Sequence, residues 1–185
     1  SMEGAFHAGY FGNMYRIPHL MQGVKLLMGC EANVVDLGGK IDLKTDTVEA
    51  LDIVLVGLHK LTPYPVNASL TENTGALVGA ITKNKIHIVS HPYRLDFPVD
   101  IIEIVRVASG QGVLLELNLA LLKLFGNKKE LLDQVDLMIE AAEKMRVKIA
   151  NFYSVYENIA GIKISDGINT WGPILPDYYG NADFS

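Results

Sequence analysis

The sequence of 185 residues is poor in the residues that mark several classes of protein. Its single cysteine, Cys30, excludes an internal disulfide framework and a cysteine-rich zinc site. Lysine and arginine form no run, and the net charge is -5, so the basic face typical of nucleic-acid-binding proteins is missing. We therefore expect no nucleic-acid partner. Histidine is also scarce, with five in the chain, so the position of each one is informative.

The sequence also has no apolar run that could cross a membrane or direct secretion. Its most apolar stretch, residues 113–125, is interrupted by Glu116, Asn118 and Lys123, whereas a membrane-spanning helix needs about 20 apolar residues. The N-terminal residues show no positively charged segment followed by an apolar one. We expect a cytoplasmic protein that does not bind a membrane.

The overall composition is that of a globular domain. Apolar residues make up 49% of the chain and charged residues 20%, and the length is sufficient to bury a core. The mean hydropathy of +0.21 predicts a buried sheet or a surface that a partner covers. We expect one domain over residues 2–163 and an extended C-terminal arm over residues 164–185, since the later segment is rich in turn-forming and aromatic residues.

Short apolar runs alternate with helical patterns along the chain. The runs are apolar at odd and even positions alike, as in strands of parallel sheets that are covered on both faces. They span residues 24–30, 53–58, 86–90, 113–117 and 147–152. The helical patterns that separate the later runs span residues 71–83, 98–108 and 128–145. This alternation predicts an α/β fold of parallel βα repeats with about five main strands, either open or barrel-like.

Polar side chains follow three consecutive runs. Glu31, His59 and His91 each come directly after a predicted strand. Because the carboxyl ends of parallel strands meet at one edge of a sheet, we expect these side chains to lie close together. Two imidazoles and a carboxylate suit zinc, manganese or iron and leave coordination positions open. The alternative is that each is an ordinary strand-end residue, the commoner role of any one of them alone.

Other candidates for chemistry are weaker. Cys30 adjoins Glu31, so a thiol nucleophile with a neighbouring histidine as its base is conceivable. A small buried hydrophobic residue is the favoured interpretation of Cys30. Lys60 and Arg94 each lie near a candidate ligand and could bind a phosphate, although exposed loop cations are usually solvated.

Several stretches resemble the polymerase and histidinol phosphatase (PHP) family, and most closely its small bacterial phosphatase branch, the YcdX-like proteins. They are MGCEANVVDLGGKIDL, IVLVGLHK and IHIVSHPYRLDFPVDIIEIVRVASGQGVLLELN. The motifs E-A-N, G-x-H and S-H-P occur in the family's order and at family-like spacing, and the resemblance covers about residues 2–150. It implies a distorted (β/α)7 barrel, of which this chain would be an incomplete form, with three metal ions at the strand tips. It also implies hydrolysis of phosphate esters.

The resemblance assigns roles to individual residues. Glu31, His59 and His91 match the protein ligands of one of the family's three metals, so we expect one divalent ion, either zinc, manganese or iron. His7 matches a histidine in the loop over the active site. The residues expected beside a small phosphorylated substrate are His7, Arg94, Glu116 and Asn118.

The sequence departs from the family at the other two metals. The first two strands of the family carry H-x-H and T-D-H motifs, and neither motif occurs here. In the last strand, Tyr153 and Val155 stand where the family has aspartate and histidine ligands. We expect either a shortened reading of a longer gene or a form that has decayed from the enzyme, with weak or absent phosphatase activity.

A non-catalytic protein that associates with itself is the alternative. Without the family's first two strands, the sheet would have an open hydrophobic edge, and such edges are normally covered or paired. Residues 164–185 or a second copy of the chain could cover this edge. On this hypothesis we expect a homo-oligomer.

Overall fold

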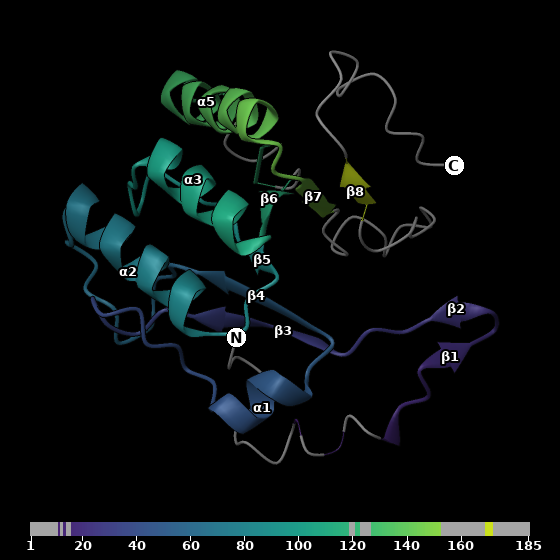
Figure 1. Ribbon diagram of the computed structural model, residues 1–185. Helices are drawn as coiled ribbons and strands as arrows, with labels where there is room; N and C mark the ends of the chain where they lie inside the picture. Colours follow the sequence, from purple (N-terminus) through teal and green to yellow (C-terminus); the bar gives the residue numbers. More distant parts are fainter. Residues whose placement is uncertain are drawn as a thin grey trace.

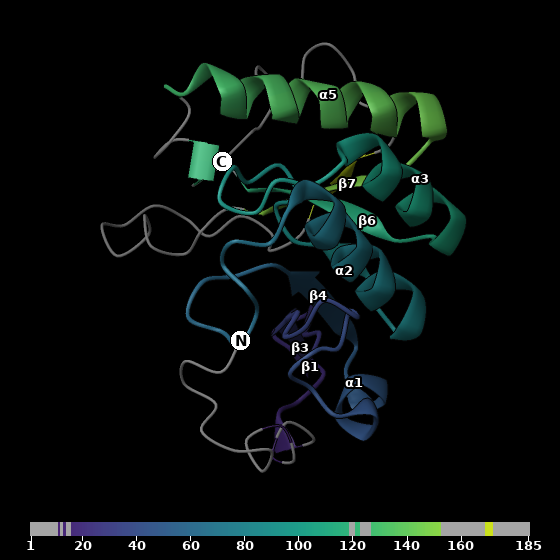
Figure 2. The same cartoon turned by 90° about the vertical axis from the view of Figure 1, so that its left-hand side faces the viewer.

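Five parallel strands form the centre of the fold, and three helices lie side by side against them (Figures 1 and 2). The computed structural model describes residues 11, 13, 16–118, 121–122, 127–152 and 169–171. The main sheet has the order β3 (Gly29–Asn33), β4 (Ile53–Gly57), β5 (Ile88–Val89), β6 (Leu114–Asn118), β7 (Ile149–Phe152) and β8 (Asn169–Trp171). The α/β class and the five parallel strands predicted from the sequence are confirmed.

The helices follow the strands in the alternation that the apolar runs predict. They are α1 (Thr45–Ala50), α2 (Leu70–Lys83), α3 (Ile101–Gln111) and α5 (Lys129–Met145). Ser69 and Glu72 form a capping box that starts α2. Asp100 caps α3 through the N–H of Glu103, so this helix begins after Pro98 rather than at it. In the described residues, no helix is both long and apolar enough to cross a membrane.

The first predicted strand is wrong in its bounds. Residues 24–30 belong to two elements: Val24–Lys25 is β2, which pairs with β1 (Leu20–Met21) in a separate antiparallel hairpin, and β3 begins only at Gly29. The hairpin extends away from the main sheet (Figure 1). Because β3 continues through Asn33 in parallel register with β4, Glu31 lies inside the strand and not beyond its end. Apolar runs alone do not show where strand partners change.

The two edges of the main sheet differ. β8 pairs antiparallel with β7 and ends the sheet on one side, whereas β3 is the last strand on the other. Part of the predicted C-terminal arm therefore covers the β7 edge, and β3 keeps an outer edge with no strand partner in the described part of the chain. The predicted boundary at residue 163 lies outside the described residues.

The core is built from the sheet and the helices on it. Val54, Ile88, Leu115 and Ile149 of four neighbouring strands are fully buried. A turn at Gly38-Gly39 brings the chain back, and the N–H of Val35 donates to the carbonyl of Lys40 across it at 2.8 Å. Gly39 has a φ of +83° and packs against the backbone of α2, where a side chain has no room.

The ring of His87 takes the place of a backbone acceptor between β4 and β5. Its Nδ1 accepts a hydrogen bond from the N–H of Val54 at 3.0 Å, and the N–H of His87 donates to the carbonyl of Val54 at 2.9 Å. Burial, with a smaller contribution from the charge of Lys85, lowers the pKa of the His87 ring. A proton on Nδ1 would break the first bond, because a charged imidazole has no acceptor.

The free energy of unfolding should therefore decrease as the pH falls below about 6.5, the ordinary pKa of histidine in an unfolded chain. Above that pH the ring is neutral in both states, and below it the unfolded chain binds the proton more readily. His87→Gln keeps an acceptor but does not titrate, so urea denaturation should show a smaller loss between about pH 7.5 and about pH 5.5 than in the wild type. Equal losses in the two proteins would contradict this role.

Candidate metal centre

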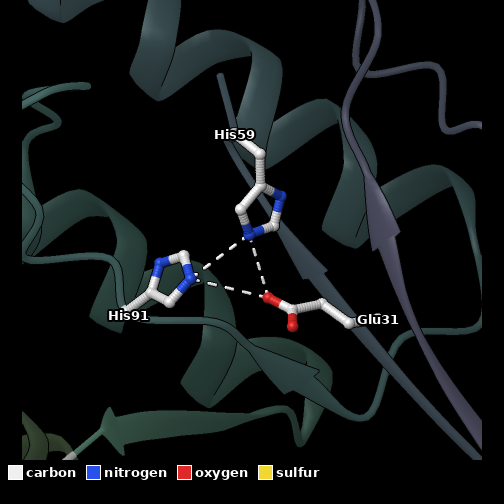
Figure 3. A group of neighbouring side chains, drawn as sticks. All are labelled: Glu31, His59 and His91. Carbon is white, nitrogen blue, oxygen red and sulfur yellow. Dashed lines mark hydrogen bonds and ion pairs between the residues drawn. The ribbon is translucent and has the colours of Figure 1, made fainter. Parts of the chain in front are cut away.

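Three side chains meet at the carboxyl edge of the sheet, from three neighbouring strands and the turns beyond them (Figure 3). Glu31 comes from β3, and His59 and His91 lie two residues beyond β4 and β5. Glu31 Oε1 is 3.0 Å from His59 Nε2 and 3.5 Å from His91 Nε2, and the two nitrogens are 3.2 Å apart. The structure thus brings together the three residues predicted as ligands.

Hydrogen bonds alone cannot satisfy this triangle of atoms. The carboxylate oxygen only accepts, and each ring nitrogen either donates or accepts. Whichever tautomers are present, at least one pair in the triangle therefore joins two donors or two acceptors. Glu31 Oε1 is also buried, where an unmatched polar atom is costly. A cation shared by the three atoms would resolve the conflict, since each can offer it a lone pair.

The spacing of the three atoms fits a bound divalent metal. A zinc ion about 2.0–2.1 Å from each of its tetrahedral ligands holds the ligand atoms roughly 3.3–3.4 Å apart. The observed separations of 3.0, 3.2 and 3.5 Å lie on either side of this value. Glu31, His59 and His91 could therefore hold one metal ion with only small adjustments.

The protonation states also suit metal binding. Burial raises the pKa of the Glu31 carboxyl, but hydrogen bonds from His59 and His91 are the main causes that bring that pKa well below its usual range. Burial lowers the pKa of His91 despite its hydrogen bond to Glu31. The carboxylate is thus charged and the His91 ring neutral at neutral pH, the forms in which both groups bind metals.

A glycine makes room for the His59 ring. A Cβ atom on Gly57 would lie 2.7 Å from Cε1 and 3.1 Å from Nε2 of His59, so the G-x-H spacing allows the imidazole to fold back over the strand end. The ring also packs edge-on against His91, with centroids 5.0 Å apart. His59 Nδ1 is buried without a hydrogen-bond partner among the described residues. These packing contacts orient the ring in place of the outer hydrogen bond that usually fixes a metal-bound histidine.

A buried glutamate holds the backbone of His91. The φ of His91 is +28°, an unusual value for a residue with a side chain that costs about 1–3 kcal/mol. Glu116 Oε2 accepts the N–H of His91 at 2.9 Å, and its Oε1 accepts the Asn118 side-chain amide at 3.1 Å. Burial and the negative charge of Glu31 raise the pKa of Glu116 to about 7. Glu116 therefore acts on the site through the backbone of His91.

The other predicted site residues lie around the triangle rather than in it. Asn118 bonds Glu116 from the end of β6. Arg94 Nη2 pairs with Asp96 at 2.7 Å, in the loop that follows His91. Cys30 is partly buried and packs against the core, as the favoured interpretation has it. The predicted or aligned positions that lie outside the described residues are His7, Tyr153 and Val155.

Two functional positions escaped the sequence analysis. Gly57 was visible only as part of the G-x-H motif, and its contact with the ring two residues later depends on the backbone path. Asp96 Oδ2 forms ion pairs with Lys60 Nζ at 3.1 Å and with Arg94 Nη2 at 2.7 Å. The R-x-D spacing was a signal for the pair of Arg94 and Asp96. Lys60, in contrast, lies 36 positions before Asp96 and is brought near it only by the fold.

Comparisons with known proteins find relatives that are named as phosphatases. A protein named probable phosphatase from Thermoanaerobacter sp. (strain X514) is 33% identical over 149 residues, which are 80% of this chain and 60% of the relative. The chain is related to probable phosphatases. Others with this name, from Acetivibrio thermocellus and Shewanella baltica (strain OS195), are 35% and 38% identical over 118 residues, or 64% of this chain.

The match covers only part of each relative. The chain spans about half the length of the curated relatives it matches, 60% of the first and 48% and 46% of the other two. No protein-family model matches the chain.

Substitution of Gly57 by alanine should weaken metal binding. The added methyl group would push the His59 ring away from Glu31, since the contact of 2.7 Å is too short to persist. We expect the affinity for Zn²⁺ or Mn²⁺, measured by calorimetry, to fall at least about tenfold, as it does when a ligand's orientation is disturbed. Gly75→Ala is the matched control, because that position in α2 has open space around it. The control should bind metal normally and gain about 0.5–1 kcal/mol of stability. Equal affinities in the two variants would refute this function of Gly57.

Removal of the Glu116 carboxyl should also affect the site. Glu116→Leu leaves the buried N–H of His91 without an acceptor and should cost about 1–3 kcal/mol of stability, together with metal affinity. Glu116→Gln retains an oxygen that can accept this N–H, so it should keep most of both. Chemical denaturation and metal titration measure the two quantities. A leucine variant that matches the wild type in metal affinity would show that His91 needs no such support.

Proposed function

We propose that the chain is a metal-dependent phosphoesterase-like protein of the PHP family. The observation that carries the proposal is the convergence of one carboxylate oxygen and two imidazole nitrogens within 4.8 Å of one another. The relation to proteins named as probable phosphatases supports it. On this proposal Glu31, His59 and His91 hold one zinc, manganese or iron ion, and the substrate is a small phosphorylated molecule.

The chain's own residues prepare the site. The ion, when bound, would polarise a phosphoryl oxygen and lower the pKa of a coordinated water. Glu31 supplies negative charge that stays ionised at neutral pH, and His91 supplies a neutral nitrogen from a buried position. The Glu31 side chain as a whole is 41% exposed, whereas its Oε1, which faces the two histidine nitrogens, is buried.

We infer weak or absent turnover for this polypeptide. Charge stabilisation of the transition state is usually the largest catalytic contribution, and one cation supplies much less of it than a cluster of three. The described residues contain one group of three metal-binding side chains. The H-x-H and T-D-H motifs that would supply further ligands are not in this sequence.

Self-association is the second candidate, and the edge of the sheet favours it. β3 is the last strand on its side of the main sheet among the described residues. The hairpin that leads into β3 exposes Leu20, Met21 and Val24, at 66%, 50% and 61% of their surfaces. Open strand edges and grouped apolar side chains are typical of surfaces that pair with another chain. We propose that a second copy of the chain covers them.

One experiment distinguishes the two candidates. The full chain is dialysed against Mn²⁺ or Zn²⁺, and its metal content, its mass by light scattering and its turnover of p-nitrophenyl phosphate are measured. We expect one bound metal per chain, lost in Glu31→Ala and retained in Glu49→Ala, which removes an exposed carboxylate from α1. Turnover should be weak or absent.

The contrary outcomes are equally clear. Robust turnover that Glu31→Ala abolishes would overturn the inference of weak activity. A metal-free oligomer would favour the self-associating protein over the phosphoesterase. A metal-free monomer would contradict both candidates.

A further inference from the structure

A pocket of about 200 Å³ is lined in part by residues from the turns that carry the two histidines of the metal centre. Lys60 follows His59, and Arg94 and Asp96 lie in the loop that begins at His91. Lys128, at the start of α5, also lines the pocket. Leucine side chains and the buried Tyr93 complete the wall, so the pocket combines an apolar surface with an excess of positive charge.

Lys60 and Arg94 share one carboxylate. Lys60 Nζ lies 3.1 Å and Arg94 Nη2 2.7 Å from the same oxygen of Asp96, Oδ2. The hydrogen bond from Arg94 is the largest cause of the lowered pKa of Asp96, so this carboxyl is ionised at neutral pH. One negative charge thus faces two positive charges, so Lys60, Arg94 and Asp96 together have a net charge of about +1.

The cluster also lies within electrostatic reach of the metal centre. The N–H of Arg94 donates to the carbonyl of His91 at 3.2 Å, and Lys60 directly follows His59 in the chain. Arg94 is only 26% exposed, so water screens its charge less than that of a free surface side chain. If a metal ion held by Glu31, His59 and His91 bound a substrate, the part of that substrate nearest to residues 91–96 would therefore lie close to this positive charge.

We propose that this pocket binds a second anionic group, a carboxylate or a phosphate, on the alcohol side of a phosphate ester held at the metal centre. The inference rests on the proposed function and adds the class of substrate: phosphate monoesters of small hydroxy acids or of compounds that carry two phosphates. Arginine pairs with carboxylates and phosphates through two parallel hydrogen bonds. The apolar wall suits a short carbon skeleton between the two anionic groups.

Two probes that differ by one carboxylate test the proposal. Phenyl phosphate and 4-carboxyphenyl phosphate are titrated calorimetrically into the full chain loaded with Mn²⁺. We expect the carboxylated probe to bind about tenfold more tightly, the effect of one hydrogen bond to a charged group. This ratio of affinities should fall to near unity in Arg94→Gln and in Lys60→Gln. Lys40→Gln, which removes a lysine from a separate surface, should keep the wild-type ratio and controls for net charge.

Asp96→Asn gives a test of opposite sign. Asp96 competes with the ligand for the two cations, so its neutral replacement should raise the ratio above the wild-type value. A ratio near unity in the wild type, or one that persists in both Arg94→Gln and Lys60→Gln, overturns the second anionic site while phenyl phosphate still binds. If neither probe binds, the proposed function itself fails, and the substrate class fails with it.

Discussion

The unsatisfied triangle of Glu31, His59 and His91 is the constraint on which the rest of the site depends. Glu31 Oε1, His59 Nε2 and His91 Nε2 are held between 3.0 and 3.5 Å apart, although hydrogen bonds cannot match all three pairs. The parallel pairing of three strands, the missing side chain of Gly57 and the hydrogen bond from His91 to Glu116 hold these atoms in place. This arrangement lowers the stability of the protein but keeps the site in a shape that suits a cation.

A large part of this arrangement could be predicted from the sequence. The alternation of apolar runs and amphipathic segments identified the parallel sheet, because buried parallel strands are typically apolar at odd and even positions alike. The same logic placed Glu31, His59 and His91 at one edge. It misplaced Glu31 relative to its strand, since periodicity does not show strand register. For His59 and His91, in the G-x-H and S-H-P motifs, the prediction of a position just beyond a strand was correct.

The parts that could not be predicted depend on contacts between distant residues. The hydrogen bond from His91 to Glu116 joins positions 25 apart, and the positive φ of His91 leaves no mark in the sequence. The pairing of Lys60 with Asp96 likewise needs the turns after β4 and β5 to come together. The motifs identify the candidate ligands, whereas the residues that orient these ligands are found only in the three-dimensional structure. Both kinds act on the same small volume beside the sheet.

The hydrogen bond to the ring of His87 restricts how the sequence of this protein can evolve. β5 contributes only two residues to its ladders, and the imidazole lengthens its junction with β4 by one more hydrogen bond. Because the His87 ring accepts a backbone hydrogen bond from β4, it fixes the path of the chain between the end of α2 and the start of β5. Insertions or deletions there would shift the ring out of reach of Val54 and move His91 with it. We expect the length of this short connection to be much less free to vary than that of an ordinary surface loop.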